Sequence, residues 1–331
     1  MKLEDVIAAL TLAMLVAYGV LAGADFGGGV LTLAARGPRR DAQRDAIDEA
    51  MGPVWEANHV WLIFVIVLLF SCFPRAFTAL TVALFTPFHL VLVGITLRGA
   101  AFVFRHYGPH REDTLARWST VFGAASVITP FLLGQCLGAV SSGRIRVGAD
   151  AAVTATAASW LSPLPLAIGA LFLAMCAYLA AVFLTVETDG DLREDFRRRA
   201  LASGTVVVGL SGLAIPLLAR EAPHLFHGLL STRATPVFAC GVVAALASGA
   251  ALWGRRYRLA RATSIAQVAL VLGGWGLAQY PYIIYPDLSV THAAAPDGTL
   301  RFVLWTVPFG MALLVPSLWL LFRVFKGRRA A

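Results

Sequence analysis

Three charged residues stand inside long apolar stretches of this 331-residue chain: Asp25, Glu56 and Arg98. A charge in such a stretch costs about 3 kcal/mol on membrane-insertion scales, so it is expected to carry protons, bind an ion or pair with another charge. Carboxylates at the same depth in the membrane would form an entry path for protons or ions. In the simpler interpretation, Asp25 and Arg98 pair and lock two helices together, while Glu56 stabilises the positive end of its own helix. We favour the pair for Asp25 and Arg98 and the proton path for Glu56, although the residue types leave both open.

The residues around Glu56 add groups that form hydrogen bonds. Trp55, Asn58 and His59 lie within one helical turn of it, and these four residues are the candidate proton path. His59 and His89 are the only histidines in or near the apolar stretches, and a haem iron needs a well-placed axial ligand. We expect His89 to be a hydrogen-bonded core histidine. For His59, a proton-conducting or structural role is favoured over haem ligation.

The cysteines do not indicate a metal site. They lie inside apolar stretches and form no CxxC pair, at positions 72, 136, 176 and 240. They are therefore interpreted as small packing residues rather than as metal ligands or disulfide partners. The chain is not expected to hold several redox cofactors itself, and no metal site is predicted.

The elements that must position these residues are membrane helices. The chain is 58% hydrophobic and 14% charged, whereas soluble domains average about 45–50% and 25%. The apolar residues come in blocks of about the 17–25 residues that cross ~30 Å of hydrocarbon. The blocks predict nine transmembrane helices, at residues 5–34, 54–73, 78–105, 115–139, 163–187, 202–219, 234–253, 259–282 and 301–325. Two connections, 38–51 and 190–200, alternate acidic and basic residues and are predicted to be short solvated helices.

Basic residues set the expected orientation. The first, third, fifth and seventh connections and the carboxyl tail, with the helix ends next to them, carry 19 of the 27 Lys and Arg residues. By the positive-inside rule these segments are cytoplasmic, which places the amino terminus outside and the carboxyl terminus inside. The net charge of +8 then needs no nucleic-acid partner, for which no binding motif is visible.

The three intramembrane charges fall in the cytoplasmic half of consecutive helices. Asp25 lies roughly nine residues from the inner end of the first helix, about 13 Å at 1.5 Å per residue. Gly19, Gly23 and Gly27 are spaced by four and leave one face of that helix as bare backbone. Such a face favours close helix packing beside Asp25.

Several segments resemble the signatures of one family. The stretch from Gly23 to Gly29 (GADFGGG) resembles the first-helix motif of subunit II of cytochrome bd-type quinol oxidases. The stretch from Gly52 to Trp61 (GPVWEANHVW) resembles that family's second-helix motif. Similar matches follow in the same order and span nearly the whole chain, at 73–74 (FP), 97–102 (LRGAAF), 276–281 (GLAQYP) and 314–319 (LVPSLW).

The resemblance implies a two-subunit terminal oxidase of the bacterial inner membrane. Such an enzyme oxidises quinol, reduces oxygen to water and takes protons from the cytoplasm without pumping them. Haems b and d would belong to the larger subunit I. Subunit II would form two four-helix bundles, here at 1–140 and 160–283, with an extra helix at 300–325. It would stabilise its partner, line part of a proton route and be a candidate holder of a structural quinone; the quinone used and a small accessory subunit stay open.

The resemblance also assigns roles by position. Glu56 matches a family carboxylate assigned to proton entry, while Asp25 and Arg98 match charged positions tied to assembly and haem retention. Val103 departs from the pattern, because some members carry an acidic residue there. A route through both carboxylates would be interrupted, so either Glu56 and His59 suffice or protons enter through the partner.

One alternative comes from a different class of protein. The same intramembrane charges would suit a proton- or cation-coupled secondary transporter. Inverted repeats and broken midplane helices would support that function, and neither is evident in the sequence.

Overall fold

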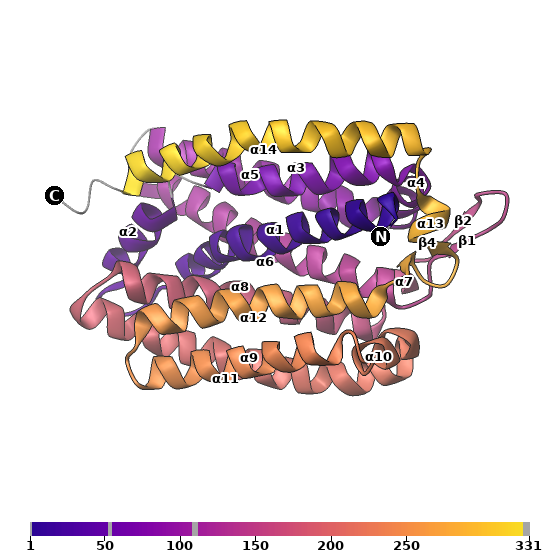
Figure 1. Cartoon of the computed structure of the whole chain (residues 1–331). Helices are drawn as coiled ribbons and strands as arrows, with labels where there is room; N and C mark the ends of the chain where they lie inside the picture. The colour runs from indigo at the N-terminus through magenta and orange to yellow at the C-terminus, as the bar shows by residue number, and fades with distance from the viewer. Residues whose placement is uncertain (1, 52–54, 108–111, 327–331) are drawn as a thin grey trace.

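The computed structural model describes residues 2–51, 55–107 and 112–326, which form one elongated bundle of α-helices (Figure 1). Apart from the connecting loops and two small hairpins, the described chain is helical, as predicted. The helices are α1 (Leu3–Ala34), α2 (Arg40–Met51), α3 (Trp55–Cys72), α4 (Pro74–Ala83), α5 (Phe85–Tyr107), α6 (Glu112–Ser141), α7 (Ala158–Leu161), α8 (Pro163–Glu187), α9 (Gly190–Glu221), α10 (Pro223–Leu229), α11 (Thr235–Trp253), α12 (Tyr257–Gln279), α13 (Val290–Ala293) and α14 (Asp297–Lys326). The antiparallel hairpins pair β1 (Arg146–Val147) with β2 (Val153–Thr154) and β3 (Tyr282–Ile284) with β4 (Leu288–Ser289).

Seven of the described helices are long and apolar enough to cross a membrane, namely α1, α5, α6, α8, α9, α11 and α14. An eighth crossing results if α3 and α4, which meet at a bend of 117°, form one broken span. Helix α12 has a comparable length, but Gln267 and Gln279 interrupt its apolar sequence. The described residues thus form a multi-pass membrane protein with seven or eight candidate spans, and they do not establish the predicted number of nine.

The structure divides the helix predicted over 78–105. Helix α4 begins at Pro74, α5 begins at Phe85, and Leu84 between them leaves the helical region at φ −110° and ψ 26°. Pro87 accounts for the break, because a proline ring clashes with the carbonyl four residues earlier, which here is that of Ala83. The bend between α3 and α4 has the same kind of cause, since Pro74 keeps the preceding residue out of the helical region.

Helix α9 is longer than predicted. The charged segment 190–200, expected as a separate surface helix, continues without a break into the crossing expected at 202–219. No glycine or proline interrupts residues 191–203, and Arg, Leu, Ala and Glu are strong helix formers. The other predicted surface helix, at 38–51, is present as α2.

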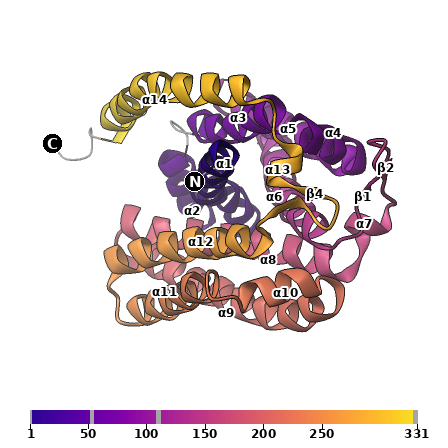
Figure 2. The same cartoon turned by 45° about the vertical axis from the view of Figure 1, so that its right-hand side comes forward.

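Helix α1 is central, and it packs against α3, α6, α8 and α12 (Figure 2). Its glycine face makes the closest approach at Gly27, where an added Cβ would overlap the carbonyl oxygen of Cys176 in α8. One turn earlier, a Cβ at Gly23 would lie 3.5 Å from Leu179 Cδ1, which is ordinary contact. Gly27 therefore lets α8 approach the part of α1 that carries Asp25.

The connections gather at the two ends of the bundle (Figure 1). The start of α1 lies at one end with the hairpins, α7, α10 and α13, while α2 and the end of α14 lie at the other. At the hairpin end, Arg146 donates two hydrogen bonds to the Asp287 carboxylate, at 2.7 and 2.9 Å. These hydrogen bonds tie the two hairpins together, and they lower the pKa of Asp287 because they stabilise its charged form.

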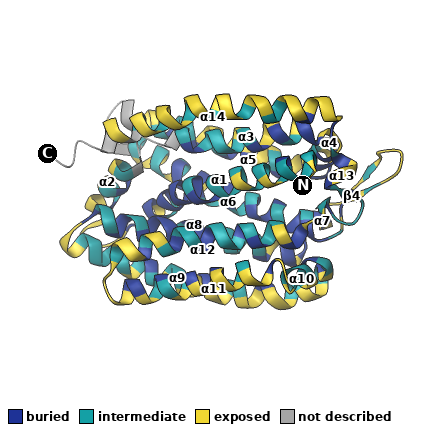
Figure 3. Cartoon of the chain, in the orientation of Figure 1, coloured by how far each residue is buried: buried dark blue, intermediate teal, exposed yellow. Residues whose placement is uncertain are grey.

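Much of the outer face of the bundle is exposed (Figure 3). Many of the exposed residues have large apolar side chains. On α14, Phe302, Trp305 and Phe309 are 70%, 74% and 71% exposed. The outward faces of α9 and α11 carry exposed apolar side chains as well, among them Val208 and Leu246. Such a surface is expected where hydrocarbon or another membrane subunit replaces water.

We expect Gly27→Ala to disrupt the bundle, because its methyl group would overlap backbone atoms rather than a side chain that can rotate away. Overpacking costs about 1–3 kcal/mol. The amount of folded protein extracted from the membrane, measured by size-exclusion chromatography of a fluorescently tagged chain, should fall several-fold. Gly23→Ala is the matched control and should stay near the wild-type amount. Equal amounts for the two variants would contradict this packing.

Candidate functional site

Asp25 and Arg98 form a buried ion pair between α1 and α5. Arg98 Nη1 donates to Asp25 Oδ2 at 2.6 Å, and Arg98 Nη2 donates to the Asp25 carbonyl oxygen at 3.1 Å. The two side chains are 3% and 1% exposed. The structure thus brings together two of the three intramembrane charges that the sequence singles out.

Side chains of α1 and α6 complete the surroundings of the Arg98 guanidinium. Arg98 Nε donates to Ser126 Oγ at 3.0 Å, and Ser126 donates in turn to the Phe122 carbonyl oxygen at 2.7 Å. The rings of Phe26 and Phe122 lie 5.0 and 4.9 Å from the guanidinium carbon, within cation–π range. Gly29 provides the space for Ser126, whose side chain a Cβ there would overlap. Helices α1, α5 and α6 therefore meet at this pair.

His59 of α3 lies beside the ion pair. The centroid of its ring is 5.9 Å from that of Phe26 and 6.0 Å from that of Tyr18. Both charges of the pair act on the ring electrostatically. Asn58, the preceding residue, is 6% exposed. Two buried oxygens nearby, Tyr18 Oη and Asp25 Oδ1, have no hydrogen bond within the described part of the chain. The amino-terminal part of α3 therefore places His59 next to the pair.

The structure does not describe the side chains of the other two candidates for the proton path. Trp55 and Glu56 lie in its first turn, but their side chains are outside the described residues. The proton-entry role of Glu56 therefore stays a prediction. Val103, where the resemblance leads us to expect an acidic residue in some family members, is 46% exposed on α5.

His89 departs from its predicted place in the core. It is exposed on α5, although its Nδ1 is 2.7 Å from the Phe85 carbonyl oxygen, so the predicted hydrogen bond is present. Successive helical residues are about 100° apart, so residues two positions apart face nearly opposite directions. Because Pro87 is buried, His89 points out of the bundle.

The surroundings of His59 do not suit a haem ligand. Both ring nitrogens of His59 are buried inside the chain, with its ring packed between Tyr18 and Phe26. An axial ligand would instead need a nitrogen directed into a space large enough for the macrocycle. Within the described residues, no three His, Cys, Asp or Glu side chains are grouped closely enough to hold a metal ion.

Sequence reasoning did not identify the partners of Arg98 on α6. Ser126 follows Phe122 by one helical turn, so a shared face was readable from the spacing. Nothing in the spacing shows that this face meets Arg98, which is 28 residues away in sequence. Tyr18 was missed for a similar reason, since one tyrosine in an apolar helix gives no sign of its neighbours.

The fold and the buried pair define a multi-pass α-helical membrane protein with charge held inside the bilayer. More specifically, the chain belongs to the family of cytochrome bd terminal oxidase subunit II, which it matches over residues 3–325.

Individual relatives agree with this family. The "Putative cytochrome bd menaquinol oxidase subunit II" of Bacillus subtilis (strain 168) is 24% identical over 93% of this chain and 91% of the relative. The "Cytochrome bd ubiquinol oxidase subunit 2" of the same organism is 28% identical over 60% of this chain. The "Cytochrome bd-I ubiquinol oxidase subunit 2" of Escherichia coli (strain K12) is 27% identical over 61% of this chain. The matches span only 58% and 53% of the latter two relatives' own length.

A solved structure shares the fold. The structure of bd oxidase from Geobacillus thermodenitrificans superimposes with a TM-score of 0.82, covering 98% of this chain and 99% of the other, at 23% identity. None of these comparisons supports the alternative of a secondary transporter.

We expect Asp25→Asn to destabilise the chain by about 3–5 kcal/mol, because Arg98 would stay buried without its carboxylate. The amount of folded protein in the membrane should fall about tenfold or more, as measured by size-exclusion chromatography. The double variant Asp25→Asn/Arg98→Met removes both charges and should recover part of that loss. A wild-type amount of the single variant would contradict the structural role of the pair.

Proposed function

We propose that this chain is subunit II of a bacterial cytochrome bd-type oxidase that couples quinol oxidation to the reduction of oxygen to water. The family match over residues 3–325 carries this proposal. The B. subtilis and E. coli relatives are named as subunits of ubiquinol or menaquinol oxidases. Because those names divide between two quinones, the proposal specifies a quinol and not which one.

The proposed partner is a haem-bearing subunit I that holds haems b and d. The burial of the His59 nitrogens within this chain supports placing the haems elsewhere. The exposed apolar side chains of α14 support contact with lipid or another membrane subunit. In this arrangement the chain stabilises its partner, and a structural quinone and a small accessory subunit are further candidates.

The proposed topology has nine crossings, as two four-helix bundles at 1–140 and 160–283 with an extra helix at 300–325. Counting α3 with α4 as one crossing and adding α12 gives this number, and the peripheral place of α14 fits the extra helix (Figure 2). The arginine-rich segments at α2, at the start of α9 and between α11 and α12 lie at the same end of the bundle (Figure 1). By the positive-inside rule that end is cytoplasmic, with the amino terminus outside.

The proposed proton path enters at Glu56, with Trp55, Asn58 and His59 as its neighbours in α3. The burial of Asn58 and the position of His59 beside the ion pair support a polar route at this level. Asp25 and Arg98 serve assembly in this proposal. The route does not use position 103, because Val103 has no group that carries a proton.

The proposal predicts where the haem is found. A complex purified from native membranes through a tag on this chain should contain a haem-rich partner and consume oxygen when supplied with quinol. The chain purified alone should lack strong Soret and α bands, because the ring nitrogens of its best-placed histidine are packed inside the bundle. Strong bands from the isolated chain would overturn the division of cofactors, and the absence of a haem-bearing partner would overturn the oxidase assignment.

We expect Glu56→Gln to slow quinol-dependent oxygen consumption more than it lowers the haem content of the complex. The amide keeps the shape of the carboxyl group but cannot carry a proton, and losing a proton-transfer group costs about 100-fold or more in rate. Asp25→Asn is the control at the other intramembrane carboxyl, and it should lower haem content along with the amount of assembled complex. Equal loss of turnover and haem in Glu56→Gln would make Glu56 a structural residue.

A further inference from the structure

A pocket lined by arginines opens at the end of the bundle that carries α2. It has a volume of about 320 Å³ and lies between the α1–α2 connection and the first turns of α9. Its polar lining comprises Arg36, Arg39, Arg198 and Arg199 with Gln43 and Asp195. Four arginines therefore line the pocket with a single carboxylate among the described lining residues.

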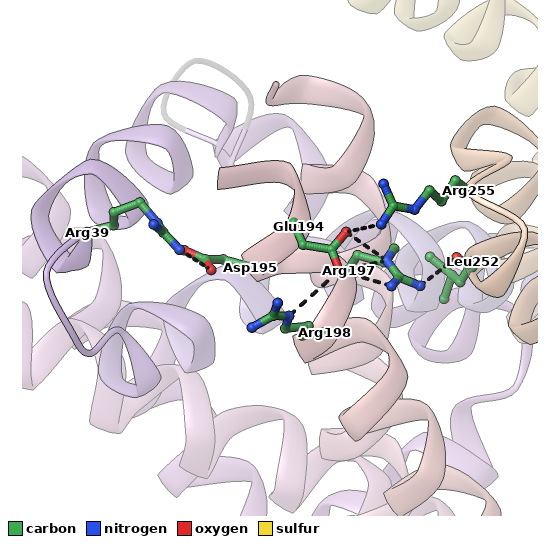
Figure 4. Close-up of polar contacts among 7 residues, drawn as sticks. All are labelled: Arg39, Glu194, Asp195, Arg197, Arg198, Leu252 and Arg255. Atoms are coloured by element: carbon green, nitrogen blue, oxygen red, sulfur yellow. Dashed lines mark hydrogen bonds and ion pairs between the residues drawn. The ribbon is translucent and has the colours of Figure 1, made fainter. Parts of the chain in front are cut away.

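That carboxylate is already engaged. Arg39 donates to both oxygens of Asp195, at 2.7 and 2.8 Å, so its guanidinium binds the carboxylate in bidentate fashion (Figure 4). Gln43 Nε2 donates to Asp195 Oδ2 at 3.0 Å. Asp195 thus neutralises Arg39, which also lies 3.4 Å from the exposed Asp191 outside the lining. The other three arginines have no ion pair with a carboxylate of the lining, although Asp195 acts on Arg199 electrostatically.

The next acidic residue along α9 does not supply the missing charge. The Glu194 carboxylate is 2.9 Å from the Arg197 guanidinium and 3.6 Å from that of Arg255 (Figure 4). The Arg198 guanidinium is the most distant of the three, at 3.7 Å, and shares this carboxylate with the other two. Arg199 instead donates to the amide oxygen of Gln43 at 2.7 Å, which is a neutral acceptor. The pocket therefore keeps an excess of positive charge.

Arg36 and Arg198 are exposed and can meet a ligand. No ion pair of Arg36 is present in the described part of the chain, and the Arg198 side chain is 75% exposed despite its long ion pair with Glu194. Arg199 is held more firmly, because it also donates to the Leu31 carbonyl oxygen at 3.3 Å. The pocket thus combines two held guanidinium groups, those of Arg39 and Arg199, with two exposed ones.

The pocket lies at the depth of lipid headgroups. Leu33, at the end of α1, is an exposed apolar residue only three positions before Arg36. On α9, the exposed Val206 follows Arg199 by seven residues, about 10 Å along a helix. The headgroup layer on each side of a bilayer is about 5–8 Å thick, so the long arginine side chains reach it.

We propose that this pocket binds a phosphate group, with the headgroup of an anionic membrane lipid as its source. Guanidinium groups match phosphate oxygens in bidentate geometry, and several of them around one cavity suit a dianionic or monoanionic phosphate. Basic pockets between helices at the membrane surface are a known form of anionic lipid site. This inference is independent of the oxidase function, since it depends only on the charges and depth of the pocket.

The test uses the full chain, purified in detergent with the subunits that accompany it and stripped of bound lipid. Three probes are titrated: dioctanoyl phosphatidylglycerol, dioctanoyl phosphatidylcholine and inorganic phosphate. Binding is followed by native mass spectrometry and by the shift in thermal unfolding. The variant Arg36→Gln/Arg198→Gln removes two exposed charges of the pocket, and Arg256→Gln/Arg258→Gln is the matched control, removing two exposed arginines at the same end but outside it.

The pocket variant should bind phosphatidylglycerol about thirtyfold more weakly. Each of the two arginines contributes about 1 kcal/mol, and 1.4 kcal/mol corresponds to a factor of ten in affinity. The control variant should bind it like the wild type, and phosphatidylcholine should bind weakly to all three proteins. If inorganic phosphate depends on the two arginines and the anionic lipid does not, the lipid source is overturned and the site binds a soluble ion. Equal binding of the anionic lipid and of phosphate by the pocket variant and the wild type would overturn the proposal. Arg36→Gln alone, at an exposed position, gives the same comparison if the double variant does not assemble.

Discussion

The buried ion pair between Asp25 and Arg98 constrains the helices around it. A charge inside hydrocarbon has no water to solvate it, so the two side chains must stay within hydrogen-bonding distance wherever their helices move. Ser126 extends the constraint from α1 and α5 to α6 through its bond to Arg98. The glycines near Asp25 make this geometry possible, because Gly29 leaves space for Ser126 and Gly27 lets the backbone of α8 approach. The relative positions of four helices therefore depend on one short segment of α1.

Much of the helical architecture could be predicted from the sequence, because hydropathy reports directly which residues can face hydrocarbon. Helix α8 begins and ends where predicted, at Pro163 and Glu187, and α11 differs by one residue. The failures have a common cause. Hydropathy does not show where a helix continues into water, so the charged start of α9 was separated from its apolar part. It also does not register a proline break inside an apolar run, so α4 and α5 were joined.

The candidate site was predictable only in part. Asp25 and Arg98 stand out because their charge is costly where they lie, and opposite charge suggests a pair. The groups that hold Arg98, namely Ser126 and the rings of Phe26 and Phe122, are ordinary residues for membrane helices. Their role depends on which faces of α1, α5 and α6 meet, and that is decided by tertiary packing rather than by local spacing. His89 shows the same limit, because its hydrogen bond is local and was predicted, while its exposure depends on how α5 is rotated.

The depth of each arginine decides what its charge can do. At the surface end of α9, arginines keep contact with water, so an imperfect ion pair costs little and a guanidinium can exchange one partner for another. Arg98 has no such freedom, since losing Asp25 would leave it uncompensated in a medium of low polarity. This matters for the proposed proton path, because His59 lies where both charges act on it. A lone Arg98 would oppose a proton arriving at His59, whereas the paired carboxylate cancels most of that repulsion at short range. In the proposed function, the ion pair therefore holds the helices together and also keeps their polar interior close to neutral.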